Sequence, residues 1–284
     1  GIIGKIYLAA RASLKYFFQF GSLKGALAYG SSFLSVRLWR VKALSEALSG
    51  HSLDGTLVLP WEGQPEQKAL CEAFSRRGSQ VFGFVHSGAG NSSTYLARSG
   101  ETLYPSKLFV PGDAVLPSLL RVGWKEKELG VFQSARLGTL DWPAARGTLF
   151  LPYDRKSTRK FLIRARELAR SGSLRVRRIQ LHPVHAHDEA LLELAGQIPL
   201  DPEANDLWIA GFSSIVLEAL ESGHSVYQLA DPLDGQLDPD HYPTVEIRVV
   251  ADSVFKLSLP PEKQGSLISR TAPTIIDCLN HRIQ

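Results

Sequence analysis

Cysteine and methionine are scarce in this sequence of 284 residues, with two cysteines and no methionine. Because Cys71 and Cys278 lie far apart and no Cys/His spacing typical of a zinc site is present, the sequence indicates a reducing compartment and no metal site. The lack of methionine, in a chain that begins at Gly1, leaves two interpretations open. Either this is a fragment of a longer protein, or methionines have been omitted from the sequence.

Long apolar runs are also missing. No run reaches the length of about 18 apolar residues that a transmembrane helix needs. Residues 2–20 are apolar but contain Lys5, Arg11 and Lys15 and lack a cleavage site, so we predict no signal peptide. We therefore expect a cytoplasmic protein. Residues 2–48 are expected to be helical, and they either lie on the inner face of the cytoplasmic membrane, where basic side chains meet anionic lipid, or pack as ordinary helices.

Several function-bearing patterns are absent as well. The sequence has neither a GxGxxG nor a GxxxxGK[ST] motif, which leaves a dinucleotide oxidoreductase or a P-loop enzyme without direct support. No internal repeat of 20–50 residues occurs. The formal net charge of +4 is small. It suits an anionic substrate or membrane surface and does not require nucleic acid as a partner.

Strand-like and helix-like segments alternate from residue 56 onward, which is typical of an α/β fold with a parallel sheet. The pattern pauses and then restarts, so we predict two Rossmann-like lobes. The expected domains are an N-terminal α/β lobe over 1–135, a linker over 136–147, a second lobe over 148–262 and a terminal helix over 263–284. Pro273 is expected to kink that helix.

The stretch Leu207–Gly223 contains a short apolar strand, the turn Gly211-Phe-Ser213-Ser214 and a segment with helical spacing that ends at Gly223. Hydroxyl residues at a helix start favour an anion, because backbone N–H groups, hydroxyl donors and the helix dipole point at one place. Serine is also a preferred N-cap, so an ordinary cap remains the alternative.

A second motif, Leu181-His182-Pro183, ends another apolar run. Ligands of open parallel sheets collect at the carboxyl ends of strands, so we expect His182 and Ser213 to meet at one phosphate. His182 would donate a hydrogen bond to that phosphate or stabilise it as charge builds up. Alternatively, His182 caps a neighbouring backbone carbonyl.

The two motifs together, with Glu-Ala-Leu-Glu-Ser-Gly behind the second, resemble the His-Pro and Ser-Ser motifs of GT-B glycosyltransferases that use CMP-sugars, the bacterial sialyltransferases and Kdo transferases. Leu-Pro-Trp-Glu62-Gly-Gln-Pro-Glu66 and Val-Phe-Gly-Phe-Val-His86-Ser are similar to segments of bacterial surface-carbohydrate biosynthesis proteins. The resemblance covers roughly residues 50–230. The chain departs from the pattern because only a short, mostly helical segment precedes residue 56, so the first lobe is expected to be short or truncated.

The resemblance implies an inverting, metal-independent transferase that moves Kdo or another nonulosonic acid from CMP to a surface glycan such as lipopolysaccharide or capsule. It implies that His182, Ser213 and Ser214 hold the CMP phosphate, and that Pro183 and Gly211 belong to the substrate-binding residues. No cofactor beyond the CMP-sugar donor would be needed, and the partners would be that donor and a glycan or glycolipid acceptor.

The resemblance assigns further residues to the nucleotide. Glu218 would bond the ribose hydroxyls, with a solvated helix carboxylate as the alternative. Tyr153 and Asp154 would contact the base.

His185 and His187 could suggest a metal, but their spacing favours solvated loop residues.

Glu62 is the candidate general base, because it follows a buried-type strand and would take the proton of an acceptor hydroxyl. The alternative is that Glu62 caps the helix beginning at Pro65, and Glu66 is a second candidate base. His86 would orient the acceptor, or else is an ordinary loop histidine. Two other functions stay open: a UDP-sugar transferase or epimerase of the same architecture, and a non-catalytic binding lobe of a glycan-assembly complex.

Overall fold

The structure is a computed structural model of the chain, and it describes residues 47–48, 55–85, 98, 102–133, 142–211, 213–230, 237, 242–269, 271–274 and 276–277. The expected helical segment at 2–48 lies almost wholly outside this part, as do His86 and Cys278. The chain divides into two compact units, residues 1–83 with 99–106 and residues 84–98 with 107–284. In the part that is described, no helix has the length and apolarity needed to cross a membrane.

The first half of the chain forms a four-stranded sheet with strand order β1-β2-β3-β4, in which β3 and β4 are parallel. Its elements are β1 (Thr56–Pro60), α4 (Pro65–Ser75), β2 (Gln80–Phe84), β3 (Lys107–Val110), η1 (Asp113–Val115), α6 (Leu116–Arg121), η2 (Glu126–Glu128) and β4 (Leu129–Val131). The sequence predicts strands over 56–60 and 107–110, and β1 and β3 have these bounds.

Local sequence explains where α4 begins. Pro65 occupies the first turn, where its missing N–H costs nothing, and Gln64 is the N-cap. The Gln67 side chain accepts the N–H of Gln64 at 2.9 Å. On the helix, Cys71 is buried, and burial raises the pKa of its thiol to about 12, so it stays protonated.

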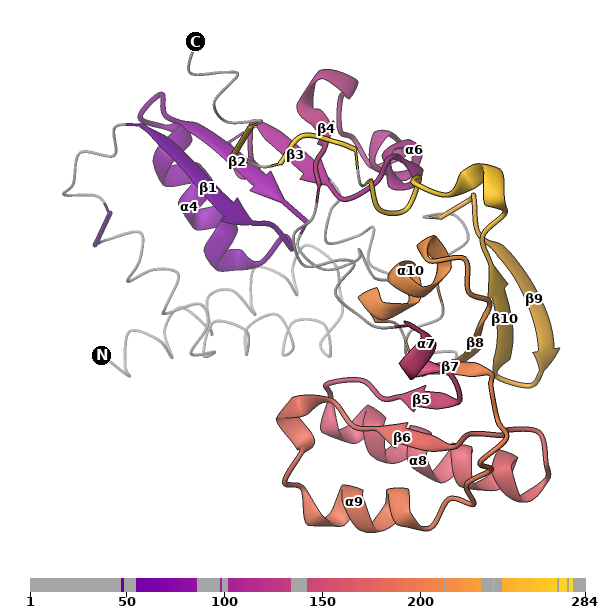
Figure 1. The fold of residues 1–284 in the computed structure, drawn as a ribbon. Coiled ribbons are helices and arrows are strands. Elements are labelled where there is room, and N and C mark those ends of the chain that lie inside the picture. The colour runs from indigo at the N-terminus through magenta and orange to yellow at the C-terminus, as the bar shows by residue number, and fades with distance from the viewer. Residues whose placement is uncertain are drawn as a thin grey trace, which may run out of the picture. The chain divides into compact units, whose positions relative to one another are not determined.

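The second half forms a six-stranded sheet with strand order β6-β5-β7-β8-β10-β9 (Figure 1). Its elements are α7 (Trp142–Ala145), β5 (Thr148–Phe150), α8 (Arg155–Arg170), β6 (Arg178–Gln180), η3 (Pro183–His185), α9 (Glu189–Gly196), β7 (Leu207–Ala210), α10 (Ser214–Glu221), β8 (Val226–Leu229), β9 (Glu246–Ala251), β10 (Val254–Ser258) and η4 (Pro261–Lys263). The predicted α/β class is confirmed.

This sheet is mixed rather than wholly parallel. β6, β5, β7 and β8 are parallel, whereas β10 pairs antiparallel with both β8 and β9. A tight turn joins β9 directly to β10, and such a short connection permits only an antiparallel pair. The alternation of strands and helices in the sequence predicts the four parallel strands. It carries no information about the direction of β9 and β10.

Helices cover both faces of the six-stranded sheet, with α8 and α9 on one side and α10 on the other (Figure 1). The α8 side holds the core: Phe161, Leu162 and Ala165 pack with Leu149 and Trp208 of the sheet. Buried positions recur along α8 at helical spacing, while its remaining positions are mostly basic. Burial of this stripe fixes α8, and with it the loops at the carboxyl end of the sheet.

Two predictions in this half are wrong. The expected linker over 136–147 contains a helical turn, α7, in which Trp142 is buried. The expected terminal helix is not helical over 265–269 and 271–274, which form turns, bends and irregular chain. The reason is that backbone N–H groups there bind the carboxylate of Glu221, at 2.5 Å from Gly265 and 2.6 Å from Leu267.

Candidate functional site

Three neighbouring parallel strands end at one edge of the six-stranded sheet. Phe150 of β5 pairs with Gln180 of β6 on one side and with Ile209 of β7 on the other. The loops after these strands therefore leave the sheet at the same level. Adjacent strands lie about 4.8 Å apart, so the chains that continue from β6 and β7 start about 10 Å apart with the loop of β5 between them.

His182 and Pro183 follow β6 at this edge, and both are exposed. His182 is the N-cap of η3, and its Nδ1 accepts the N–H of Val184 at 3.3 Å. The ring of His182 meets the ring of Tyr153 edge-on, at 6.3 Å between centroids. Because Nδ1 acts as an acceptor, a neutral His182 carries its proton on Nε2. The capping alternative is thus partly right, with the ring accepting an N–H instead of donating to a carbonyl.

The loop after β5 contributes Tyr153 and Asp154. The side chain of Tyr153 is 73% exposed, so the ring is accessible beside His182. Asp154 is the N-cap of α8, and its carboxylate accepts the N–H of Ser157 at 2.7 Å. That backbone hydrogen bond is the main reason why the pKa of Asp154 lies below its usual value. Asp154 is therefore an anion that closes the start of α8.

His185 was predicted to be a solvated loop residue, and this is wrong. The residue is buried, and its Nε2 lies 2.6 Å from the backbone oxygen of Tyr153. Pro183 starts a single tight helical turn, which folds His185 back toward the sheet. His185 thereby joins the loops after β5 and β6. His187, by contrast, is exposed as predicted.

The helix starts of α8 and α9 are tied together as well. Asp188 is the N-cap of α9, and it accepts hydrogen bonds from Arg155 at 2.6 and 3.2 Å. The hydrogen bond from Arg155 is the largest cause of the low pKa of Asp188. The same contact raises the pKa of Arg155. The Arg155–Asp188 contact thus links the helix starts that follow the loops of Tyr153 and His182.

The turn after β7 is built around Gly211, which is buried and has a φ of 67°. Its N–H donates to the backbone oxygen of Leu229 at 2.7 Å. Its carbonyl oxygen accepts from the Gln228 side chain at 2.9 Å, and Gln228 in turn accepts the N–H of Leu237 at 3.1 Å. Gln228 is fully buried. No sequence motif singled out this residue, and a glutamine within an apolar strand was the only signal for it.

Ser213 and Ser214 begin α10, and both are half-buried. Ser213 is the N-cap, with its Oγ accepting the N–H of Ile215 at 3.4 Å. A serine hydroxyl that accepts in a cap retains its own proton as a donor. The cap and an anion contact are therefore compatible at Ser213.

Glu218 is 6% exposed. The alternative of a solvated helix carboxylate is therefore wrong for this residue, while its role toward a ribose stays a prediction. Glu221, one turn later, is 7% exposed and binds the backbone of residues 265–268. Both carboxylates of α10 lie inside the fold.

Glu62 belongs to the other compact unit and follows β1. Its neighbour Trp61 is fully buried, whereas Glu62 is half-buried. The Glu62 N–H donates to Gln67 Oε1 at 2.9 Å, and Gln67 Nε2 donates to the Pro60 oxygen at 2.7 Å. The prediction that Glu62 caps the next helix is wrong, because Gln64 is the N-cap. Gln67 shapes this turn, and sequence reasoning did not identify it.

A cavity of about 310 Å³ borders the Gly211 turn. Phe161 lines it, and the ring of the same residue lies 3.2 Å from where a Cβ on Gly211 would stand. Leu229 and Ala230 at the carboxyl end of β8 line it as well, so the cavity lies along the same sheet edge. The remaining lining comes from α8 and the turn after β9: Lys160, Ile163, Arg164, Glu167 and Ser253.

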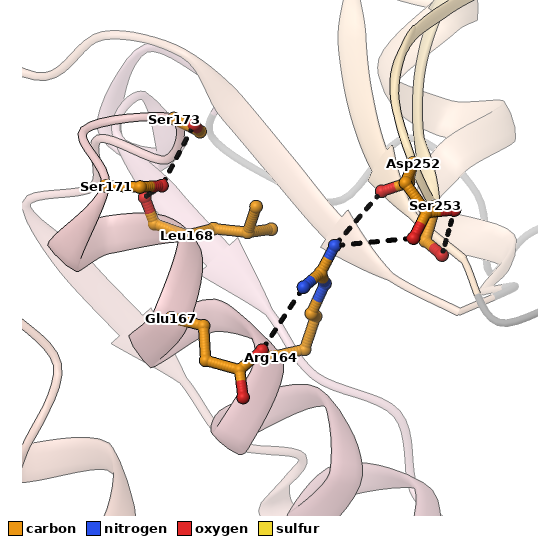
Figure 2. A network of polar contacts seen from close by, with 7 residues as sticks. All are labelled: Arg164, Glu167, Leu168, Ser171, Ser173, Asp252 and Ser253. Atoms are coloured by element: carbon orange, nitrogen blue, oxygen red, sulfur yellow. Dashed lines mark hydrogen bonds and ion pairs between the residues drawn. The ribbon is translucent and has the colours of Figure 1, made fainter.

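Arg164 lines this cavity, and its guanidinium lies between Glu167 and the β9–β10 turn (Figure 2). Its guanidinium contacts Glu167 at 3.2 Å on its own helix. It also reaches the turn between β9 and β10, where it donates to the backbone oxygen of Asp252 at 3.4 Å and lies 3.7 Å from the Asp252 carboxylate. The Arg164 side chain thus joins α8 to the β9–β10 turn beside the cavity.

The described residues include no group of three or more His, Cys, Asp or Glu that could hold a metal ion. Comparison of the sequence with models of known protein families and with curated proteins gives no match.

Proposed function

We propose that the chain is a glycosyltransferase of GT-B type, which binds a CMP-activated sugar such as Kdo or another nonulosonic acid in its C-terminal half. The observation that carries this proposal is the common edge at which β6, β5 and β7 end. Ligands of such sheets bind where parallel strands end. The three loops at this edge carry His182, Tyr153 and Ser213.

The phosphate of CMP would lie above the loop of β5. His182 Nε2–H would donate from the side of β6, while the Ser213 hydroxyl and the start of α10 would donate from the side of β7. The strands that carry these donors flank β5 about 10 Å apart, and the side chains must span part of that gap. These donors would offset the charge that develops on the leaving phosphate, so that transfer needs no metal.

The remaining parts of the nucleotide have room beside the phosphate. The exposed ring of Tyr153 offers a face to the base or sugar. The cavity near Gly211 is lined by the apolar Phe161 and Leu229 and by charged side chains of α8, two of them basic (Lys160 and Arg164) and one acidic (Glu167). Lining of this kind suits a ligand with a flat ring and a negative charge.

Glu62 would act as general base, taking the proton from an acceptor hydroxyl as the oxygen attacks the anomeric carbon. This attack displaces CMP and inverts the configuration at that carbon. The acceptor would be a surface glycan or glycolipid. The two-lobe GT-B arrangement is part of the proposal, supported by the two α/β halves of the chain.

A panel of nucleotides tests the proposal. Thermal unfolding of the full chain is measured with CMP, UDP and GDP at equal concentrations. CMP is expected to raise the unfolding temperature, because a ligand that binds only the folded state adds about 2.7 kcal/mol at a hundred times its Kd. Stabilisation by UDP alone would indicate a UDP-sugar enzyme. No stabilisation by any of the three would contradict the proposal and favour a non-catalytic lobe.

A further inference from the structure

A second cavity, of about 110 Å³, lies at the opposite edge of the six-stranded sheet. Its lining includes Leu207, the first residue of β7, and Ser225, which precedes β8. These are the amino-terminal ends of the parallel strands, whereas the candidate nucleotide site lies at their carboxyl ends. The cavity is therefore separate from that site within the same unit.

Aromatic rings line this cavity. Trp142 of α7 is 7% exposed, and its ring lies 5.7 Å from the ring of His224. In the described part of the chain, the indole Nε1 of Trp142 is buried without a hydrogen-bond partner. Tyr227 of β8 lines the cavity too, and it is held by stacking on Trp208 at 4.8 Å and 22°. The cavity is thus lined by two aromatic side chains, Trp142 and Tyr227.

Charges of both signs lie around the rings. Arg146 and Lys256 bring a guanidinium and an ammonium group, and Lys256 Nζ stands over the Tyr227 ring at 5.7 Å. Asp206 adds a carboxylate to the same lining. Burial, with the charge of Arg146 as a second cause, keeps the pKa of His224 below its usual value. His224 is therefore mostly neutral at pH 7.

We infer that this cavity binds a hydroxylated carboxylic acid, namely a sugar acid presenting one ring. Arg146 and Lys256 match the carboxylate. The Asp206 carboxylate accepts hydrogen bonds from donors such as sugar hydroxyls. The rings of Trp142 and Tyr227 add apolar surface to the lining, which suits the C–H groups of a sugar. A ligand that carries both an acid and hydroxyl groups satisfies the cations and the carboxylate of this lining.

This inference does not depend on the proposed transferase activity or on nucleotide binding at the other edge. In a transferase, a second site for a sugar acid would hold part of an acidic glycan acceptor at a distance from the glycosidic bond that is formed. The two proposals fail separately, because CMP binding and sugar-acid binding are measured with different probes and different variants.

The indole N–H signals report on this site. The sequence contains five tryptophans, so the ¹⁵N-labelled full chain gives five indole signals, and Trp142→Phe identifies that of Trp142. Titration with D-glucuronate in the millimolar range is expected to shift the Trp142 signal and leave those of Trp61 and Trp124 in place. D-glucose and inorganic phosphate are expected to shift it far less. A shift as large with either of them, or none with glucuronate, would overturn the inference.

Two single variants test the cationic groups. Arg146→Gln and Lys256→Gln should each weaken glucuronate binding about tenfold, the usual effect of removing one charge-assisted hydrogen bond. Arg146 is exposed, so its substitution should leave folding intact even if Lys256→Gln disturbs the sheet. Lys127→Gln, an exposed lysine of η2, is the matched control and should bind like the parent. Unchanged binding by both Arg146→Gln and Lys256→Gln would contradict the assignment.

Discussion

Gly211 shows how one backbone angle shapes the candidate site. Its φ of 67° lets the chain turn from β7 into α10, and a Cβ there would stand 3.2 Å from the ring of Phe161. Gly211→Ala should therefore lower the free energy of unfolding by the left-handed penalty of about 1–2 kcal/mol and by a further contact cost. Urea denaturation measures the total change in the free energy of unfolding.

Gly172→Ala is the matched control for that substitution. Gly172 has a φ of 74°, yet nothing lies within 4 Å of its Cβ position. It should lose only the left-handed penalty, so Gly211→Ala should be the less stable of the two variants. Equal losses would show that the packing of Phe161 against Gly211 does not constrain the turn.

Glu62 carries the chemistry of the proposed reaction. Glu62→Gln keeps the shape of the side chain and its backbone hydrogen bond to Gln67, but it removes the group that accepts a proton. Transfer from a CMP-sugar should fall by a factor of about 10²–10⁴ while CMP affinity stays the same. Retained transfer, measured as CMP release, would remove Glu62 from the mechanism. Glu126→Gln serves as the control, because Glu126 is an exposed carboxylate of η2 that has no part in the proposed reaction.

Sequence motifs located the residues at the strand ends, and they could not show what holds them. His182, Ser213 and Gly211 stand at one sheet edge, as their positions after apolar runs predicted. His185 and Gln228 hold the loops through contacts with the backbone of Tyr153 and Gly211. Such partners are distant in sequence, so a single sequence gives no signal for them.

At the scale of elements, the terminal segment is held by a side chain of α10. The Glu221 carboxylate accepts the N–H groups of Gly265, Leu267 and Ile268, the last at 3.1 Å. Ser269 of this segment then donates to the backbone oxygen of Pro111 at 2.6 Å. One buried carboxylate thus orders a segment that sequence periodicity predicted to be helical.

Glu221→Gln tests this contact. The amide retains only one acceptor oxygen and no charge, so the free energy of unfolding should fall by about 1.5–3 kcal/mol. Hydrogen exchange at Leu267 and Ile268 should accelerate. Glu193→Gln, an exposed carboxylate of α9, is the control and should change neither quantity. Unchanged exchange at Leu267 in the Glu221 variant would show that the carboxylate does not hold the segment.

At the scale of the whole molecule, composition and alternation of strands and helices predicted the α/β class and the order of the elements. β1 and β3 have the predicted bounds, and β7 lies where a short apolar strand was predicted. Sheet membership and strand direction could not be predicted for β9 and β10, because they depend on the pairing of β10 with β8 and of β9 with β10. The same holds for the candidate site. The sequence predicted the sheet edge at which the site lies, but not the cavity near Gly211.

The proposal that His182 and Ser213 hold one phosphate is tested most directly by calorimetric titration of the parent chain, His182→Ala and Ser213→Ala with CMP and with cytidine. Each variant should bind CMP roughly ten- to a hundredfold more weakly, since each loses a hydrogen bond to a charged group. Cytidine, which lacks the phosphate, should bind all three chains alike. His187→Ala, an exposed histidine near the same loop, should bind CMP like the parent. Equal CMP affinity in the parent and in both site variants would contradict the proposed site.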